Sequence, residues 1–306
     1  MKVEKLLKKL VKIKGELDMV ERNLKLIIDA QGKEKSITYA PELYKESLRN
    51  NNLERHLFIP DIQIPDHNPE ALSVLLKFIP DFKPHTVHIL GDFLNFTKAS
   101  TFIEIGGYDV SLAEEVEEAK EILNQIVLTS RQDNPKARIC WYEGNHELRL
   151  QKFLAREGNI LTSLQDKEGN QLISVPAIFG LKDLGVDWIP YYETNKLDSI
   201  EVEHGDVVRV KAGFTAQAML EKRGKSGFSG HSHRLALVTR SQGDTVRFWV
   251  ECGSLCNLHP TPIYTRKPDW INGFAVGIFD KKQDIMHPIP ILMQKNQFWW
   301  GETVYK

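Results

Sequence analysis

Apolar residues recur with heptad spacing at the start of this chain. From Val3 to Ile27 they follow one another at alternating steps of three and four, the pattern of a helix with one apolar stripe. Lysines cover the other faces of its first half. Gly15 interrupts the pattern at a cost of about 1 kcal/mol relative to alanine, so two helices hinged there would also fit. We predict helical structure over residues 2–30.

Three interpretations of this N-terminal segment stay open. The helix packs on the rest of the chain, or it joins copies of the chain into a homo-oligomer through residues 3–27, or its lysines form a basic arm for nucleic acid. The last is the weakest because no aromatic residues stand among the lysines. Residues 31–54 are predicted to be a linker with a short helix around 41–49. The chain therefore divides into an N-terminal part, residues 1–54, and a larger domain, residues 55–306.

Short β-like runs alternate with helical patterns in this larger domain. The runs are short and largely apolar, whereas the helical segments carry apolar residues on one face. Asn68–Pro69 and the capping box of Ser111 and Glu114 mark two helix starts. This alternation is typical of the α/β class. The predicted strands are His56–Ile59, Thr86–Leu90, Arg138–Tyr142, Val186–Ile189, Ile200–Glu203, Leu235–Thr239, Val246–Val250, Phe274–Phe279 and Ile285–Leu292.

The helix that begins after Ser111 is rich in glutamate. Its apolar residues recur at helical spacing, which leaves the acidic side chains on the other faces. We expect these acidic residues to form a solvated face and not a metal site; they are Glu114, Glu115, Glu117, Glu118 and Glu121.

Composition narrows the class of protein. The chain has 306 residues, of which 42% are hydrophobic and 26% charged, as in an ordinary globular protein. Its net charge of −1 provides no global basic field for nucleic acid. The three cysteines cannot all pair and resemble no disulfide framework. No apolar run approaches the ~20 residues of a membrane span, and the basic N-terminus lacks a secretory apolar region. We therefore expect a cytoplasmic protein that does not bind membranes.

Polar motifs follow four of these β-like runs, and a fifth motif follows the short run Ser226–Ser229. Open α/β sheets bind ligands at the carboxyl ends of their strands, so carboxylates, an amide and imidazoles should converge there. Residues two apart in extended chain point the same way, so Asp61 and Gln63, like the two histidines of the last motif, form pairs. Together the motifs indicate a metal site. They are Asp61-Ile62-Gln63, Gly91-Asp92-Phe93-Leu94-Asn95, Gly144-Asn145-His146-Glu147, His204-Gly205 and Gly230-His231-Ser232-His233.

This ordered set resembles the motifs of the calcineurin-like metallophosphoesterases, and in particular their phage-type branch. The family's motifs run Asp-x-His, Gly-Asp-x-x-Asp/Asn, Gly-Asn-His-Asp/Glu, a lone His and Gly-His-x-His, and the match spans residues 55–235. This chain departs once, with Gln63 where the family usually has histidine. The resemblance implies a four-layer αββα sandwich of two mixed β-sheets flanked by helices, here with an N-terminal helical extension.

The resemblance also implies two divalent cations and a ligand set for them. Asp92 would bridge both cations, while Asp61 and His233, with Gln63, would hold the first. An amide oxygen is a harder and weaker donor than imidazole, so the first site should favour manganese over zinc and exchange its cation. Iron, zinc, nickel and magnesium are the alternatives, and Gln63 could instead hydrogen-bond a metal-bound water. The full implied set is Asp61, Gln63, Asp92, Asn145, His204, His231 and His233.

The implied reaction is the hydrolysis of a phosphoester by a hydroxide that bridges the two metals. His146 would act as the general acid that protonates the leaving group, or would stabilise the developing charge. Asn95 would support His146 or the phosphate, and Glu147 would cap the following helix. We add His67 and Arg234 as candidate substrate contacts, although Arg234 could equally form a structural salt bridge.

Three functions compete on these residues. The first is a phosphodiesterase with some phosphomonoesterase activity, since no arginine can be assigned as a clamp for a dianionic phosphate. The second is a nuclease or nucleic-acid end-processing enzyme, with a nucleotide or nucleic acid as substrate. The third, suggested by Gln63 and opposed by His146, is a metal-binding scaffold without turnover.

Overall fold

The computed structural model describes residues 41–101, 110–197, 199–242, 245–258 and 269–306. The chain from Ala40 to Lys306 forms one compact unit. The predicted N-terminal helix, and with it the predicted oligomer contact, lies outside the described residues. Among the helices that are described, none combines the length and apolarity needed to span a membrane.

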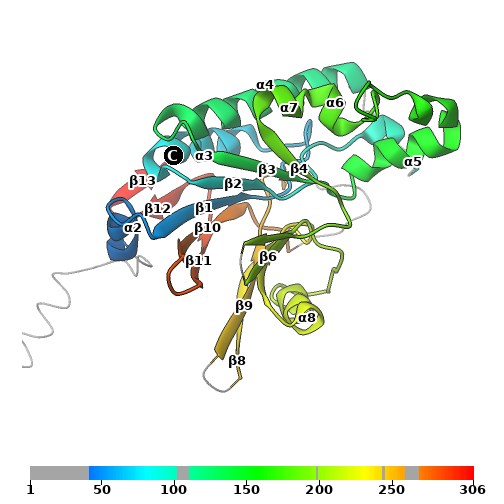
Figure 1. Cartoon of the computed structure of the whole chain (residues 1–306). Coiled ribbons are helices and arrows are strands. Elements are labelled where there is room, and N and C mark those ends of the chain that lie inside the picture. The colour runs from blue at the N-terminus through cyan, green and yellow to red at the C-terminus, as the bar shows by residue number, and fades with distance from the viewer. Residues whose placement is uncertain (1–40, 102–109, 198, 243–244, 259–268) are drawn as a thin grey trace, which may run out of the picture. The chain divides into compact units, whose positions relative to one another are not determined.

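Six strands form the first sheet, in the order β11-β10-β1-β2-β3-β4 (Figure 1). Strands β1 to β4 run parallel, β10 pairs antiparallel with β1, and β11 pairs antiparallel with β10. All four residues of β2 are buried, because both faces of a sheet of this kind are covered. The strands are β1 (Leu53–Ile59), β2 (Thr86–Ile89), β3 (Arg138–Tyr142), β4 (Val186–Ile189), β10 (Gly273–Asp280) and β11 (Ile285–Leu292).

Five strands form the second sheet, in the order β5-β6-β7-β9-β8. Strands β6, β7 and β9 run parallel, with antiparallel β5 and β8 at the two edges. The strands are β5 (Asn195–Leu197), β6 (Ile200–Glu203), β7 (Ser226–Ser229), β8 (Leu235–Gln242) and β9 (Thr245–Cys252). A separate hairpin of β12 (Phe298–Trp300) and β13 (Thr303–Tyr305) is not predicted by the hydrophobic pattern.

The helices begin where the sequence signals place them. Asn68 accepts a hydrogen bond from the N–H of Ala71, and Ser111 and Glu114 form the predicted capping box. The helices are α2 (Pro41–Ser47), α3 (Pro69–Phe82), α4 (Leu112–Gln132), α5 (Glu147–Glu157), α6 (Val175–Phe179), α7 (Leu181–Leu184) and α8 (Phe214–Arg223), with 3-10 turns at Thr97–Ala99 and Asn159–Ser163.

These elements stack in four layers. A first apolar core lies between the first sheet and helices α3 and α4, which cover its outer face (Figure 1). A second core joins the two sheets, where Phe58 of β1 stacks on Phe228 of β7 with ring centroids 3.8 Å apart. A third, smaller core seats α8 on Trp249 of β9. The predicted fold of two mixed sheets flanked by helices is confirmed.

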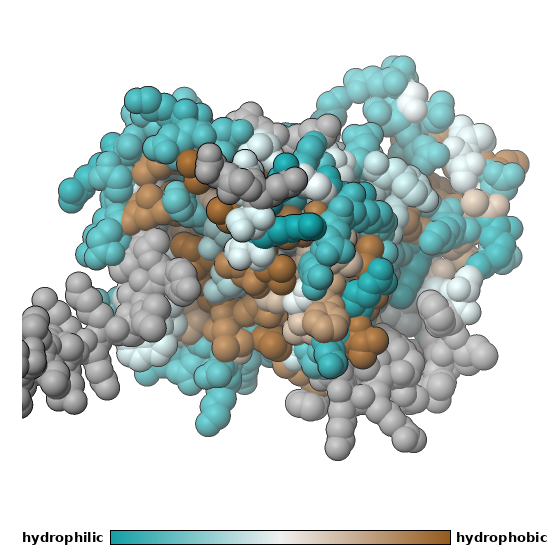
Figure 2. All heavy atoms as spheres, turned by 90° about the horizontal axis from the view of Figure 1, so that it is seen from below, coloured by the Kyte–Doolittle hydropathy of each residue, from teal (hydrophilic) through white to brown (hydrophobic). Residues whose placement is uncertain are grey.

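Helix α8 packs on the outer face of the second sheet, against Trp249 and Val238. On the opposite face, which Phe248 and Val250 share, the hairpin of β8 and β9 keeps Leu237 and Val246 exposed. Seen from below, hydrophobic residues gather near the centre of the face, with hydrophilic residues around them (Figure 2).

Glu115 is the exception to the predicted solvated face of α4. Its side chain is buried, and its carboxylate accepts a hydrogen bond from the backbone N–H of Phe96. Phe96 has a left-handed backbone, with φ 46°, so its N–H needs an acceptor outside regular structure. Burial raises the pKa of Glu115 to about 7. The prediction is therefore wrong for this residue, which instead stabilises the loop that carries Asn95.

Candidate metal centre

The carboxyl ends of five strands bring the motifs together. Asp61 follows β1, Asp92 follows β2 and Asn145 follows β3 in the first sheet. His204 follows β6 and His231 follows β7 in the second sheet. Parallel strands end at the same edge of their sheet. Because the two sheets pack face to face, side chains from both edges meet.

Strained backbone is concentrated at the predicted ligands. A positive φ is rare for residues other than glycine, costs on the order of 1–3 kcal/mol each, and clusters at functional sites. Five predicted ligands have it: Asp61 (35°), Gln63 (58°), Asp92 (46°), His231 (67°) and His233 (56°). The strained backbone therefore directs these ligand side chains toward one another, at a cost in stability.

Two motif glycines are required by close approach. A Cβ on Gly144 would meet Asp92 Oδ1 at 2.2 Å, and one on Gly230 would meet Asp61 Oδ2 at 2.4 Å. Real Cβ atoms do not come this close to carboxylate oxygens, so neither position tolerates a side chain. These glycines let the two carboxylates lie directly under the turns that carry the other ligands.

We call Asp92, Asn145, His204 and His231 the second ligand cluster. Asp92, His204 and His231 each offer a ligand atom, and these atoms lie within 4.8 Å of one another. His204 Nε2 lies 3.0 Å from Asn145 Oδ1 and 3.1 Å from His231 Nδ1. The fold therefore brings together the four residues expected to hold the second cation.

The orientation of His204 shows that this cluster suits a cation. Its Nδ1 lies 2.7 Å from the carbonyl oxygen of Leu90, which only accepts, so Nδ1 carries the proton of the neutral ring. Nε2 is then a bare lone pair that faces Asn145 Oδ1 and, at 3.4 Å, Asp92 Oδ1. Lone pairs repel unless a proton or a cation lies between them. Although burial opposes it, the charges of Asp92 and Asp61 raise the pKa of His204.

Asp61, Gln63 and His233 form what we call the first ligand cluster. His233 Nε2 lies 3.4 Å from Asp61 Oδ1 and 3.0 Å from Gln63 Nε2. A half-turn of the Gln63 amide would present its oxygen at the same point. His233 Nδ1 lies 3.8 Å from the thiol of Cys256, a weak partner. Asp61 also joins the two clusters, because its oxygens accept the N–H of His231 at 3.0 and 2.9 Å.

His146 is held beside Asp92 by a chain of hydrogen bonds. Its N–H donates to Asp92 Oδ1 at 2.8 Å, and its Nδ1 lies 3.1 Å from Asn95 Oδ1. Asn95 Nδ2 donates to Asp66 Oδ2 at 2.7 Å, which orients the amide with its oxygen toward His146. Burial raises the pKa of Asp66 to about 6, so it is ionised at neutral pH. Burial, together with the charge of Arg149, lowers the pKa of His146 to about 3.

Arg149, like Asp66, is a charged residue at this site that the sequence reasoning missed. Its Nη2 lies 2.9 Å from His146 Nε2, and its Nη1 donates to the carbonyl oxygen of Asn95 at 2.7 Å. The sequence signal for Arg149 was its spacing from His146, because residues three apart in a helical turn lie on the same side. Without knowledge of where His146 points, that spacing alone selects no function.

Glu147 does not cap the helix in the expected way. Its side chain is fully buried, and it accepts the N–H groups of Asp92 at 2.9 Å, Phe93 at 2.7 Å and Gly144 at 2.8 Å. Burial, and then the charge of Asp92, raises the pKa of Glu147 to about 8. The carboxyl group thus ties the turn after β2 to the turn after β3, because those N–H groups have no strand partner.

The two candidate substrate contacts lie against other parts of the protein. His67 Nδ1 is 3.8 Å from Glu118 Oε1 on α4. Arg234 donates from Nε to Asp269 at 2.6 Å and from Nη1 to the carbonyl oxygen of Arg209 at 2.7 Å. The geometry of Arg234 is that of the structural salt bridge, and a substrate contact of His67 stays a prediction.

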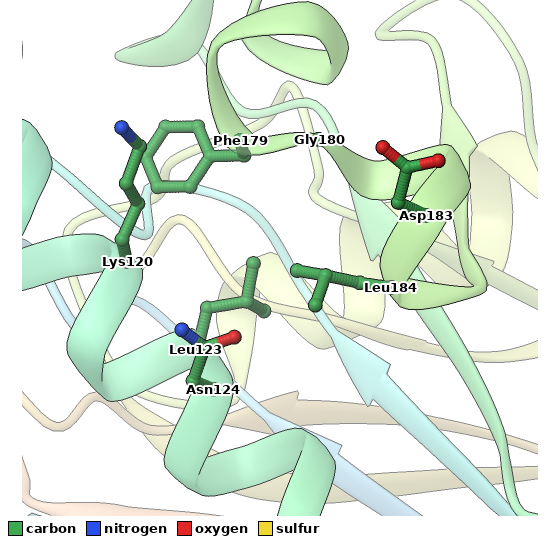
Figure 3. Close-up of a pocket in the computed structure, with 7 residues that line it drawn as sticks. All are labelled: Lys120, Leu123, Asn124, Phe179, Gly180, Asp183 and Leu184. Carbon is green, nitrogen blue, oxygen red and sulfur yellow. The ribbon is translucent and has the colours of Figure 1, made fainter.

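A hollow of about 230 Å³ lies between α4 and the short helices α6 and α7 (Figure 3). Leu123, Phe179 and Leu184 make its apolar walls, with Lys120 and Asp183 at its polar side. It shares no residue with either ligand cluster, so it is not the candidate metal centre.

No family model matches this chain, and no curated protein matches it. Among solved structures, the fold is similar to that of Vps29 from Chaetomium thermophilum, with a TM-score of 0.38. That alignment has 14% sequence identity and covers 83% of this chain and 95% of the other. A similarity this distant says nothing about activity or partners.

Proposed function

We propose that this chain is a metal-dependent phosphoester hydrolase related to the phage-type calcineurin-like metallophosphoesterases. Phosphodiesters are the proposed main substrates and phosphomonoesters a side activity. The observation that carries the proposal is the convergence of His204 Nε2 with the oxygens of Asn145 and Asp92 beside His146, while His204 Nδ1 meets the carbonyl oxygen of Leu90. A water-filled site would need a proton there, whereas a cation satisfies all three atoms at once.

The donor sets fit two divalent cations. The second ligand cluster offers a carboxylate, an amide oxygen and two imidazoles, and the first offers a carboxylate, an imidazole and the amide of Gln63. Because oxygen donors suit manganese and magnesium better than zinc, manganese is the proposed cation of the first cluster. When bound, two cations supply Lewis-acid chemistry, since they polarise the phosphoryl group and acidify water.

His146 is the proposed proton donor to the leaving oxygen. Asn95 accepts the Nδ1 proton, so the ring presents Nε2 toward Asp92, 3.6 Å from its Oδ2. In the free chain Nε2 is bare, because Arg149 donates to it. An anionic ester beside this atom offsets the charge of Arg149 and allows Nε2 to take up the proton that it then delivers.

A nuclease is the second candidate, and one observation favours it. The ring of Trp270 lies 4.4 Å, centroid to centroid, from that of His233 and is partly exposed. Aromatic side chains beside a phosphate site stack nucleobases, at about 1–3 kcal/mol per base. A nucleotide or a single-stranded nucleic acid is the substrate that would use this surface.

The test is a matrix of metals against substrates. The metal-depleted full chain is refilled with manganese, magnesium or zinc and assayed on an aryl phosphomonoester, an aryl phosphodiester, a cyclic nucleotide and single-stranded DNA. We expect manganese to restore phosphodiester hydrolysis and zinc to restore little. His204→Ala should abolish metal-dependent turnover, whereas His287→Ala, an exposed histidine of β11, should not change it.

Two other outcomes have definite meanings. Two bound equivalents of metal without turnover of any substrate would make the chain a metal-binding scaffold. Failure to bind any of the three metals would overturn the whole proposal.

A further inference from the structure

We propose that Arg149 binds a phosphoryl oxygen of the substrate and thereby sets how well monoesters compete with diesters. This inference rests on the proposed phosphoesterase function and names a substrate contact within that site. It supplies the arginine that no sequence motif of this chain identifies.

The position of Arg149 is set by two contacts of its guanidinium. Nη1 donates to the carbonyl oxygen of Asn95 at 2.7 Å, which anchors one side of the planar group to the loop after β2. Nη2 lies 2.9 Å from His146 Nε2, the atom that faces the ligand clusters. Because the guanidinium is planar and held at Nη1, the direction of Nη2 is fixed before any ligand arrives.

The direction of each proton along this chain of contacts follows from chemistry. Ionised Asp66 only accepts, so Asn95 presents its NH2 to Asp66 and its oxygen to His146. His146 must then donate from Nδ1, which leaves Nε2 bare in the neutral ring. Arg149 is a donor only, so it donates to Nε2. Every contact has one donor and one acceptor, and the chain of contacts ends on the cationic N–H that meets His146 Nε2.

That last contact is the one an anion should replace. A neutral imidazole is a weaker partner for guanidinium than an anionic phosphoryl oxygen, because attraction between opposite charges adds to the hydrogen bond. An oxygen that enters between the two side chains can accept from Arg149 Nη2 in place of His146 Nε2. Substrate binding thus exchanges a contact of the guanidinium with a neutral ring for one with an anion.

The charge of the substrate decides how much Arg149 contributes. A phosphomonoester can carry two negative charges and a phosphodiester carries one, so the attraction of a fixed cation is larger for the monoester. Loss of Arg149 should therefore harm monoester hydrolysis more than diester hydrolysis. A residue that only stabilised α5 or the loop would lower both to the same degree.

The test compares Arg149→Gln, Arg149→Lys and, as a matched control on the same helix, Arg156→Gln. Arg156 is exposed and pairs with its neighbour Glu157 at 2.6 Å. Calorimetry with inorganic phosphate on the manganese-loaded full chain measures binding without turnover, and steady-state kinetics give KM and kcat on an aryl monoester and an aryl diester. Metal content is measured for each variant.

We expect Arg149→Gln to weaken phosphate binding at least tenfold and to lower kcat/KM more for the monoester than for the diester, with metal content unchanged. Arg149→Lys should recover part of the phosphate affinity but not the whole, because an ammonium lacks the planar fork. Arg156→Gln should match the unmodified chain in every measurement. Phosphate affinity within twofold of the unmodified chain in Arg149→Gln would overturn the inference.

Failure of the inference is distinguishable from failure of the proposed function. If the unmodified chain hydrolyses esters and Arg149→Gln binds phosphate normally, only the inference fails. If the unmodified chain binds phosphate through Arg149 but hydrolyses nothing, the phosphoesterase proposal fails and the contact stands. Should Arg149→Gln not fold, nitrogen NMR of the unmodified magnesium-loaded chain decides. The guanidinium signal that Arg149→Lys lacks must move on addition of phosphate, and a stationary signal overturns the inference.

Discussion

The two ligand clusters differ in how firmly each imidazole is held. In the second cluster, Nδ1 of His204 meets the carbonyl oxygen of Leu90 at 2.7 Å. In the first, Nδ1 of His233 meets the thiol of Cys256 at 3.8 Å. A carbonyl acceptor fixes the tautomer and makes the opposite nitrogen a better ligand, whereas a thiol does both weakly.

The amide in the first cluster adds to this difference. Gln63 occupies a place where imidazole would bind zinc-like cations more tightly. We therefore expect a tightly held cation at His204 and an exchangeable one at His233. Metal affinity at this site therefore depends on the hydrogen-bond partner of each ligand as well as on the ligand itself.

The largest expected effect on both ligand clusters comes from removing the carboxylate that the two cations would share. Asp92→Asn should lower kcat/KM by orders of magnitude and reduce metal content at both clusters, because the amide carries no charge to hold two cations. Asp187→Asn, which changes a surface partner of Arg138, is the control and should leave activity unchanged. Activity within a few-fold of the unmodified chain, with unchanged metal content, would contradict a bridging role.

The next largest effect is expected from a substitution that leaves both ligand clusters intact. His146→Ala removes the proposed proton donor and should slow hydrolysis of alkyl esters roughly 10²–10⁴-fold. The loss should be smaller for an aryl ester, because a leaving group of low pKa needs little protonation. Rates are compared across leaving groups, with metal content as the control. Equal losses on alkyl and aryl esters would argue for charge stabilisation instead of proton donation.

Replacing the Gln63 amide with an imidazole should make the metal affinities of the two clusters more similar. Gln63→His should tighten the first cation site and shift its preference toward zinc, since imidazole suits zinc better than an amide oxygen does. Metal retained through dialysis, and activity against free metal concentration, measure both. If the unmodified chain already keeps two equivalents of zinc and Gln63→His changes nothing, the first cluster is not the weaker one.

The smallest predicted effect concerns imidazoles outside both clusters. His56 and His88 are buried between the sheets, with His56 Nδ1 3.1 Å from His88 Nε2, and burial lowers the pKa of each. Below the ordinary value of about 6.5 the unfolded chain binds protons that the folded chain does not, so stability falls as pH decreases. Burial also lowers the pKa of His85 to about 4, with the same sign.

Melting temperatures of the metal-free chain between pH 8 and pH 5 test this effect. The drop should be smaller in His88→Phe than in the unmodified chain, since one buried imidazole no longer takes up a proton on unfolding. An equal change of melting temperature in His88→Phe and in the unmodified chain would contradict it. The comparison of the two chains separates the sandwich interior from the ligand clusters, because the cluster residues titrate in the same way in both.

Much of the fold could be predicted because its signals are local. The run Arg138–Tyr142 matches β3 residue for residue, and Asn68–Pro69 marks the start of α3. Buried strands of a parallel sheet are continuous apolar runs, and caps such as Ser111 lie within a few residues of what they cap. The ends of those strands in turn located Asp92, Asn145 and His204.

The sequence by itself determined which residues could serve as ligands and where the strands that carry them end. Only the tertiary structure decided what stands around them. Asp66 and Asn95 are 29 residues apart and Arg149 and Asn95 are 54 apart, yet each pair is joined by a hydrogen bond. The sequence likewise predicts that Glu115 is a solvated helix residue, but in the structure the loop after β2 packs on it. Hydrophobic periodicity reports on neighbours in the chain, whereas partners of polar groups depend on how distant turns meet.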